Sequence, residues 1–406
     1  MRILFADAVD ESRLERLRSG GHECVVEPSL SSDDLAARVP GFEVLVVRST
    51  KVTAATIQAG ANLSLIVRAG AGTDNIDTDL AAERAVYVAN VPGRNSTAVA
   101  ELTIGLLLAV DRRIADGAQE LREGTWNKAE YRTADGVFGK SIGIVGLGAI
   151  GLEVAQRAKA FGMDVIAVRK PNRSEGTERR IRQVGVRLVD SLEDLVPQCD
   201  VVSIHVPKTA ETAGLVDADF LAMMRPNAIL LNTARGETMV EADLLAALNG
   251  GLRAGLDVYP NEPSGSSGPF ESVIAAHPNV VGSHHIGAST EQAQSATVDG
   301  TIEVIEAFET GEIRNCVNLE TSVLGASTIA IRHEDKVGVL AKVFQALRTA
   351  GMNVQQMENQ VFRGSRAAVA TINIDGQLDD ATRSLIEELP EVFGVACVDR
   401  SSNGGR

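Results

Sequence analysis

One glycine-rich segment constrains the fold of this chain more than any other feature. The apolar run Ile142–Val145 predicts a strand, and the pattern from Leu152 to Phe161 predicts a helix. Between them stands the Gly-x-Gly-x-x-Gly sequence Gly146-Leu147-Gly148-Ala149-Ile150-Gly151. In this setting the first glycine permits a tight turn, the second lets the backbone approach a pyrophosphate, and the third lets helix and strand pack closely. N–H groups at the helix start attract phosphate, so we expect a dinucleotide-binding site.

Strands and helices alternate on both sides of this segment. In residues 1 to about 92, the runs Val44–Val47 and Leu65–Val67 have strand length, and 33–39 is a short helix. Continuous apolar strands separated by helices imply parallel sheets that are covered on both faces. A helix from Ser96 to about Ala115, after the N-cap residues Asn95-Ser96, is apolar nearly all round, which predicts burial between domains or subunits. Further elements are expected at 165–168, 201–204 and 229–232 (strands) and 290–310 (helix).

The last part of the chain has a different pattern. Strands are expected at 328–332, 353–361, 367–374 and 395–399, with helices at 337–350 and 379–389. This βαββαβ order is typical of a ferredoxin-like module. We expect a linker at 320–327 and a frayed tail at 401–406.

Charge and cysteine content exclude several classes of protein. The formal net charge is −15, and so acidic a surface repels nucleic acid and anionic lipid. No apolar stretch is long enough to span a membrane. The four cysteines have neither CxxC nor metal-ligand spacing, so we expect free thiols, no metal site and a reducing, cytoplasmic location.

Basic residues follow the expected strand 165–168. Arg169-Lys170 stands where NAD-binding proteins usually carry Asp or Glu for the ribose hydroxyls, and Arg173 follows. A guanidinium attracts the 2′-phosphate of NADP through charge-assisted hydrogen bonds. The sequence therefore predicts NAD or NADP, with NADP favoured. In the alternative, the Arg169 guanidinium stacks on the adenine ring, and the site still accepts NAD.

Three residues occur in the order that hydride transfer from a hydroxy acid requires. Arg235, in Asn232-Thr233-Ala234-Arg235-Gly236 after a predicted strand, would hold a carboxylate. His285 would exchange the hydroxyl proton, and Glu262 would fix its tautomer and raise its basicity. His205, at the end of the strand 201–204, is the rival base, although the following Val206-Pro207 turn favours a place beside the cofactor.

Together these segments resemble the D-isomer-specific 2-hydroxyacid dehydrogenases, in particular the phosphoglycerate branch that carries a C-terminal ACT-type regulatory domain. The resemblance covers nearly the whole chain. Besides the motifs above, it rests on Val47-Arg48-Ser49, Arg68-Ala69-Gly70-Ala71-Gly72-Thr73-Asp74-Asn75-Ile76-Asp77, Asn90-Val91-Pro92-Gly93-Arg94-Asn95-Ser96 and His285-Ile286-Gly287-Ala288-Ser289-Thr290.

The resemblance implies a role for each matching position. Arg235, Glu262 and His285 would be catalytic. The substrate and its phosphate would contact Arg48, Ser49, Arg68 and Gly70, with Lys128 as a further candidate. The dinucleotide would contact Ala71, Gly146, Gly148, Ala149, Ile150, Gly151, Arg169, Lys170, Val206, Thr233, Asp257, Gly287 and Ala288.

The resemblance also implies a domain plan and partners. A Rossmann-type doubly wound cofactor domain (93–285) would be inserted into a flavodoxin-like α/β substrate domain (1–92 and 286–320), followed by an ACT module (327–400). The helix 96–115 would help form a homodimer or homotetramer. His333 and Asn353 would contact L-serine or another amino-acid effector, although Asp335 and Val337 replace the Asn and Pro of the serine-binding turn.

The implied activity is oxidation of 3-phospho-D-glycerate to 3-phosphohydroxypyruvate with NAD(P), the first step of L-serine biosynthesis. An NADPH-dependent hydroxypyruvate or glyoxylate reductase is the alternative that Arg169 would suit. A non-catalytic dinucleotide-sensing regulatory protein is an alternative of another class. The segment 263–269 after Glu262 is longer than the family pattern expects.

Overall fold

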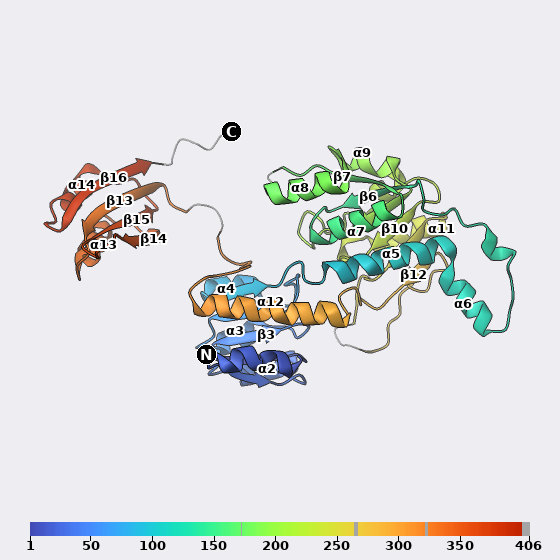
Figure 1. The fold of residues 1–406 in the computed structure, drawn as a ribbon, viewed down its shortest axis with the longest axis horizontal. Coiled ribbons are helices and arrows are strands. Elements are labelled where there is room, and N and C mark those ends of the chain that lie inside the picture. Colours follow the sequence, from blue (N-terminus) through green and yellow to red (C-terminus); the bar gives the residue numbers. More distant parts are fainter. Residues whose placement is uncertain (172, 264–266, 321–323, 400–406) are drawn as a thin grey trace. The chain divides into compact units, whose positions relative to one another are not determined.

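The computed structural model describes residues 1–171, 173–263, 267–320 and 324–399, which fall into two compact units, Met1–Asn318 and Leu319–Arg406 (Figure 1). The predicted tail 401–406 lies outside the described residues. The predicted linker and the segment after Glu262 do so in part, at 321–323 and 264–266. Within the described ranges, no helix is both long and apolar enough to cross a membrane. All four cysteines are free, and burial raises the pKa of the Cys199 thiol to about 11.

The first unit begins with a five-stranded parallel sheet in the order β2-β1-β3-β4-β5, the flavodoxin-like order that the resemblance implied. Successive side chains of a strand point to opposite faces, so Val44 and Val46 join one core while Leu45 and Val47 join another. The strands are β1 (Arg2–Phe5), β2 (Glu23–Val26), β3 (Val44–Val47), β4 (Leu65–Arg68) and β5 (Tyr87–Asn90). The helices are α1 (Glu15–Ser19), α2 (Ser32–Arg38), α3 (Ala54–Ala59) and α4 (Thr78–Glu83).

A second, seven-stranded parallel sheet in the same unit has the order β12-β11-β10-β9-β6-β7-β8. The order reverses between β6 and β9, and ligands of such sheets bind at this reversal. The expected Rossmann-type doubly wound sheet is confirmed. Its strands are β6 (Ser141–Val145), β7 (Asp164–Val168), β8 (Arg187–Val189), β9 (Val201–Ile204), β10 (Ile229–Asn232), β11 (Arg253–Leu256) and β12 (Val280–Gly282). Its helices are α7 (Ala149–Ala160), α8 (Glu175–Val184), α9 (Leu192–Leu195), α10 (Ala218–Met223) and α11 (Glu241–Asn249).

The helix predicted from Ser96 to about Ala115 is shorter than expected. It ends at Arg112, because Arg113 has a left-handed backbone (φ 51°), and a second helix, α6 (Ile114–Arg122), follows. α5 (Ser96–Arg112) packs against α7 and β10–β12. Asn95 occupies the N-cap, but with ψ near 0° instead of extended its side chain makes no capping hydrogen bond.

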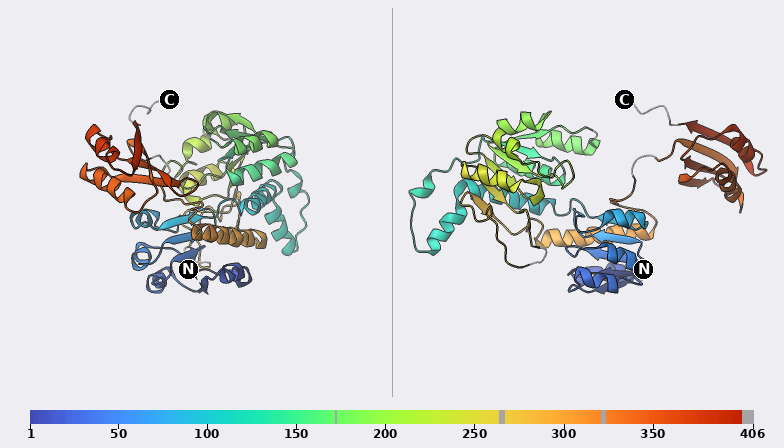
Figure 2. Two further views of the ribbon diagram at one scale, coloured as in Figure 1. Left: turned by 60° about the vertical axis from the view of Figure 1, so that its left-hand side comes forward. Right: turned by 180° about the vertical axis from the view of Figure 1, so that it is seen from behind.

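The chain returns to the first sheet through α12 (Glu291–Glu309), which Figures 1 and 2 show lying against the N-terminal elements. Four acidic side chains on α12 pair with basic groups there: Asp299 with Arg13, Glu303 with Arg94, Glu306 with Arg16 and Glu309 with His22. Beyond α12, the backbone of Cys316 forms an isolated antiparallel β-bridge with Ala89 of β5, and the Asn318 side chain makes hydrogen bonds to the backbone of Val86 and Val88.

The second unit has the predicted βαββαβ order. Its antiparallel sheet runs β14-β15-β13-β16, and α13 and α14 pack on one face around Ile331, Val343 and Ile386. The elements are β13 (Ser327–Glu334), α13 (Val339–Thr349), β14 (Val354–Val361), β15 (Ala367–Ile374), α14 (Asp380–Glu387) and β16 (Val392–Asp399). The ferredoxin-like prediction is therefore confirmed.

Candidate active site

The three glycines of the loop after β6 have different surroundings. Gly146 has φ +99°, and a Cβ there would lie 2.5 Å from the carbonyl oxygen of His205. A Cβ at Gly151 would lie 2.2 Å from the oxygen of Gly146 and 3.0 Å from Ile144. Gly148 directly precedes the first turn of α7, which Ala149 and Ile150 begin. A Cβ at Gly148 would have no heavy atom within 4 Å beyond its chain neighbours. Packing therefore requires two of the glycines, while the third leaves space beside the helix start, which fits a dinucleotide phosphate.

The basic residues after β7 already have protein partners. The Arg169 N–H donates to the carbonyl of Val189, which places its side chain beside Asp190, with Nε 3.4 Å from Oδ1. Arg173 donates to the carbonyl of Val168, 3.1 Å away. The Arg169 side chain is 62% exposed and Lys170 is exposed too, so both are open to an anion. Asp190 is a neighbouring carboxylate that the sequence pattern does not single out.

His205 directly follows β9 and lies beside the glycine loop. Its backbone N–H donates to the carbonyl of Val145 at 2.7 Å, and its ring Nε2 lies 2.7 Å from Ser203 Oγ. Burial lowers the pKa of the imidazole to about 3, so the ring is neutral near pH 7. An imidazole with so low a pKa is a weak base, which disfavours His205 as the rival to His285.

Asn232 holds the turn that carries Arg235. Its fully buried side chain accepts from the N–H of Ala234 (2.9 Å) and donates to the carbonyl of Arg235 (3.1 Å). The hydroxyl of Thr233 lies 2.9 Å from that of Thr103 on α5. A Cβ at Gly236 would lie 2.1 Å from the Tyr259 backbone. These contacts explain why Asn and Gly flank the arginine in this motif.

Arg235 and Arg68 lie directly against glycines of the loop after β4. A Cβ at Gly70 would lie 1.7 Å from Nη1 of Arg68, and one at Gly72 would lie 2.0 Å from Nη2 of Arg235. Arg235 Nε also donates to Asp74 Oδ2 at 3.0 Å. The backbone of Ala71, between these glycines, accepts from Asn90.

Three arginines lie close enough together to repel one another. Burial, followed by the charges of Arg235 and Arg48, lowers the pKa of Arg68 to about 10. The Arg48 loop is anchored by Asp7, whose carboxylate accepts from the N–H groups of Arg48 (2.7 Å), Ser49 (3.1 Å) and Thr50 (3.3 Å). The sequence pattern does not single out Asp7, although a polar residue directly after a buried strand is a usable signal. Lys128, the further candidate, is exposed.

His285 and Glu262 are joined by a short hydrogen bond. Nδ1 of His285 lies 2.6 Å from Oε2 of Glu262, and Oε1 accepts from the Tyr259 N–H at 2.8 Å. A carboxylate can only accept, so the proton of this bond sits on Nδ1. The bond to Glu262 raises the pKa of His285 despite its burial. Among the described residues, no group bonds to Nε2, which leaves that atom available to exchange a substrate proton.

Asp257 holds the loop on which His285 lies. It is buried, and its carboxylate accepts from Ser283 Oγ (2.6 Å) and from the N–H groups of Ile286 (2.9 Å) and Gly287 (2.8 Å). Its carbonyl accepts from the His285 N–H at 2.8 Å. His285 itself has φ +52°, a left-handed backbone that this network supports. Ala288 lies in the same loop.

In the second unit, the two residues assigned to an effector have different environments. His333 is buried, donates from Nδ1 to the carbonyl of Glu334, and places Nε2 3.2 Å from Oδ1 of Asn359. Asn353 is exposed, and its N–H donates to Asp375. The imidazole is thus bonded to Asn359 and not to Asn353.

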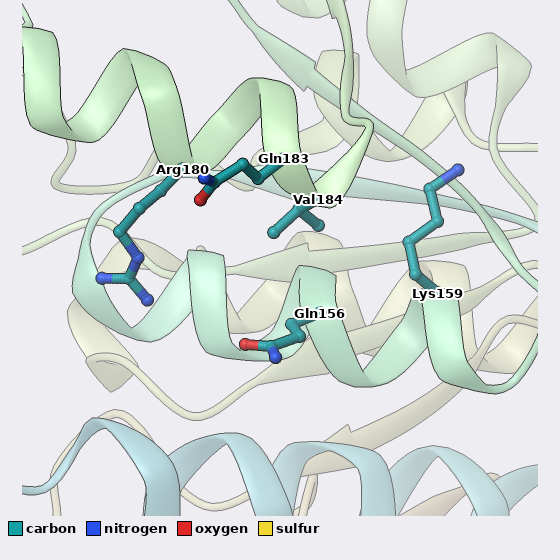
Figure 3. Close-up of a pocket in the computed structure, with 5 residues that line it drawn as sticks. All are labelled: Gln156, Lys159, Arg180, Gln183 and Val184. Atoms are coloured by element: carbon teal, nitrogen blue, oxygen red, sulfur yellow. The ribbon is translucent and has the colours of Figure 1, made fainter.

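A separate hollow lies between α7 and α8 (Figure 3). It is close to the C-terminal half of α7, away from the glycine loop, and Arg180 is already bonded to Glu153 at 3.0 Å. It therefore has no part in the candidate site. Its lining residues are Gln156, Lys159, Arg180, Gln183 and Val184.

Comparisons with known proteins agree with this geometry. Residues 104–287 match the family model "D-isomer specific 2-hydroxyacid dehydrogenase, NAD binding domain". The chain is 39% identical over 323 residues to the D-3-phosphoglycerate dehydrogenase of Archaeoglobus fulgidus, covering 79% of this chain and 59% of that protein. It is 40% identical over 296 residues to the hydroxypyruvate reductase of Thermotoga maritima, covering 72% and 93%.

A solved structure is similar as well. The TT0316 protein from Thermus thermophilus matches with a TM-score of 0.67 and 34% identity, over 78% of this chain and all of that one. The chain spans about 60% of the length of the phosphoglycerate dehydrogenases to which it is similar.

Proposed function

This chain belongs to the D-isomer-specific 2-hydroxyacid dehydrogenase family, and from that premise we propose that it oxidises 3-phospho-D-glycerate to 3-phosphohydroxypyruvate, the first step of L-serine biosynthesis. The observation that supports this choice of substrate is the cluster of Arg48, Arg68 and Arg235. Guanidinium groups bind carboxylate and phosphate through charge-assisted hydrogen bonds. Arg68 and Arg235 lie against the loop after β4, and Arg48 is a third positive charge near Arg68, which suits a small molecule with an anion at each end.

The residues of the candidate site divide the work of a hydride transfer. A nicotinamide dinucleotide, when bound, accepts or returns the hydride. Nε2 of His285 takes the proton of the C2 hydroxyl during oxidation and returns it during reduction. Glu262 keeps the other ring proton on Nδ1 and stabilises the imidazolium that forms. Arg235 holds the carboxylate of the substrate, and Arg48 and Arg68 hold its phosphate.

The loop after β6 and the first turn of α7 are the parts of this chain that fit the dinucleotide. Gly148 leaves room for the pyrophosphate, and the amides of Ala149 and Ile150 begin the helix. Asp257 keeps the segment from His285 to Ala288 in place beside it. Support for these assignments comes from the position of the glycine loop beside β6, where the strand order reverses.

We propose that NADP is favoured over NAD. Arg169 and Lys170 are exposed at the end of β7, where a cation about 4 Å from the 2′-phosphate gains roughly 4 kcal/mol at an effective dielectric near 20, before desolvation. Asp190 opposes part of that attraction. The expected net preference in kcat/KM is about tenfold, and Arg169→Asp should reverse it. A ratio that the substitution leaves unchanged contradicts the proposal.

A second function is favoured by one specific observation. The Thermotoga hydroxypyruvate reductase is 40% identical to this chain, which covers 93% of it. A hydroxypyruvate or glyoxylate reductase needs the same three catalytic residues but no phosphate site. Phosphorylated and unphosphorylated substrates therefore distinguish the two functions.

The deciding experiment is a steady-state assay of the purified chain with both cofactors against phosphoglycerate, glycerate, glyoxylate, 2-oxoglutarate and hydroxypyruvate. We expect the highest kcat/KM for phosphoglycerate. A higher value for glyoxylate, or for hydroxypyruvate in the reverse direction, supports the reductase, and absence of turnover with every substrate supports the dinucleotide-sensing alternative.

We further propose a homo-oligomer in the cytoplasm. Ile114, Leu121 and Trp126, on or next to α6, are all more than half exposed, which suits a subunit contact, and the free thiols suit a reducing compartment. We also propose an amino-acid effector such as L-serine, from the resemblance of the turn 333–338 to a serine-binding turn, although Asp335 and Val337 depart from that pattern. Light scattering for mass and a thermal-shift titration with L-serine test these two points.

A further inference from the structure

The loop after β4 makes a direct ionic contact with the turn after β10. Asp74, in that loop, accepts a hydrogen bond from Nε of Arg235 at 3.0 Å. The two residues are 161 positions apart in sequence, so the contact joins the five-stranded sheet to the seven-stranded sheet. The Asp74 side chain is 48% exposed, and that of Arg235 is 28% exposed. The pair is accessible, yet the arginine is mostly covered.

The other contacts of Arg235 leave one edge of its guanidinium open. Nη1 donates to the carbonyl of Ala234 at 2.7 Å. Nη2 lies against Gly72, where a Cβ would come within 2.0 Å of it. Among the described residues, Nη2 has no hydrogen-bond acceptor. The guanidinium is therefore held at Nε and Nη1, while Nη2 stays available for a carboxylate.

The charges around Arg235 explain why it needs a carboxylate partner. Arg68 lies close enough for Arg235 to lower its pKa, and Arg48 adds a third positive charge. Lys208, paired with Glu237 at 2.7 Å, lies close enough to interact with both Arg235 and Asp74. Like charges repel, and a long arginine side chain loses considerable conformational freedom when it is held in one rotamer. Asp74 offsets both effects through a direct bond.

We propose that Asp74 is a positioning residue that fixes Arg235 for recognition of the substrate carboxylate. Asp74 acts through Arg235 and does not itself touch the substrate. Gly72 contributes to the same positioning, since any side chain there would displace the guanidinium of Arg235. The inference rests on the proposed function, because it takes Arg235 as the group that holds the carboxylate.

The test compares two ketone phosphates that differ only at the recognised group. In 3-phosphohydroxypyruvate a carboxylate is attached to the ketone carbon, and in dihydroxyacetone phosphate a hydroxymethyl group replaces it. In Asp74→Ala, the KM for 3-phosphohydroxypyruvate should rise about tenfold while kcat changes less than about threefold, because ground-state binding is lost. The preference in kcat/KM for the carboxylate-bearing substrate should fall about tenfold. Asp74→Glu, which keeps the carboxylate, should recover most of both quantities.

Two further variants keep the result interpretable. Gly72→Ala keeps the Asp74 carboxylate, which lies 3.1 Å from the added Cβ, but the methyl group overlaps Nη2 of Arg235 far more closely, at 2.0 Å, and should displace the guanidinium. It should therefore raise the same KM even if Asp74→Ala folds poorly. Asp77→Ala is the matched control: this carboxylate is in the same loop but caps α4 through the Leu80 N–H. It should lower the Tm without changing the KM.

The outcomes separate this inference from the proposed function. If Arg235→Ala abolishes the preference for the carboxylate while Asp74→Ala leaves KM and preference unchanged, Asp74 is only a surface ion-pair partner and the inference is wrong. A fall in kcat at constant KM in Asp74→Ala also overturns it. If Arg235→Ala itself leaves the preference unchanged, the proposed role of Arg235 has failed.

Discussion

Replacing Glu262 with glutamine tests the proton-transfer role of His285 directly. The change keeps the size of the side chain and removes its charge, which is what raises the pKa of His285 through a 2.6 Å bond. Two unit charges about 4 Å apart interact by about 4 kcal/mol at an effective dielectric of 20 and by about 1 kcal/mol in water. The two side chains are 48% and 30% exposed, so solvent screening reduces the gain to ~1–2 kcal/mol. Losing this attraction removes stabilisation of the imidazolium, so we expect the pKa of His285 to fall.

The direction of the change in rate follows from which form of the imidazole reacts. Oxidation requires neutral His285, so its kcat/KM falls as the pH drops through the pKa, and Glu262→Gln should move this acid limb to lower pH. Reduction requires the protonated ring, so its alkaline limb should move lower by a similar amount. The measurement is kcat/KM against pH in both directions.

Two variants serve as controls for this shift. Glu237→Gln removes a carboxylate that pairs with Lys208 at 2.7 Å, whereas the carboxylate bonded to His285 belongs to Glu262, so both limbs should stay in place. His285→Ala should remove the limbs together with most of the turnover, by ~10²–10⁴-fold. Limbs that do not move in Glu262→Gln would show that another group controls the proton.

Two further predictions concern ligand binding. Arg48→Ala and Arg68→Ala should each raise the KM for the phosphorylated substrate by about tenfold or more, because a charge-assisted contact contributes ~1.5–3 kcal/mol. The KM for hydroxypyruvate should stay nearly unchanged. Equal losses for both substrates would contradict a phosphate site. Gly148→Ala should weaken dinucleotide binding, measured by calorimetry, without lowering the Tm, because the new methyl group enters open space; an unchanged affinity would mean that no ligand approaches there.

The sequence predicts most of the fold because its signals are local. The elements of the second unit begin and end within a few residues of the predicted bounds, since each apolar run contains its own periodicity. The break at Arg113 was not predictable in this way, because neither Gly nor Pro marks it. The three-residue strands β8 and β12 are too short to show a period.

The same difference between local and long-range signals applies to the candidate site. His285, Glu262 and Arg235 stand in motifs that can be read along the chain, and the structure joins the first two by a hydrogen bond. Asp7 and Asp74 act on residues about 40 and 161 positions away, and no local pattern contains such a separation. Their roles depend on which strand ends lie side by side.

The return of the chain through α12 has a consequence for its synthesis on the ribosome. Ile302 and Ile305 of α12 share a buried cluster with Ile3 and Phe5, and Asn318 bonds to the backbone beside β5. At roughly 5–20 residues per second, these partners emerge about 12–60 s after the strands they cover. During that interval one face of the N-terminal sheet lacks part of its apolar cover. The seven-stranded sheet, whose strands all come from residues 141–282, can therefore be completed first, although it is begun second.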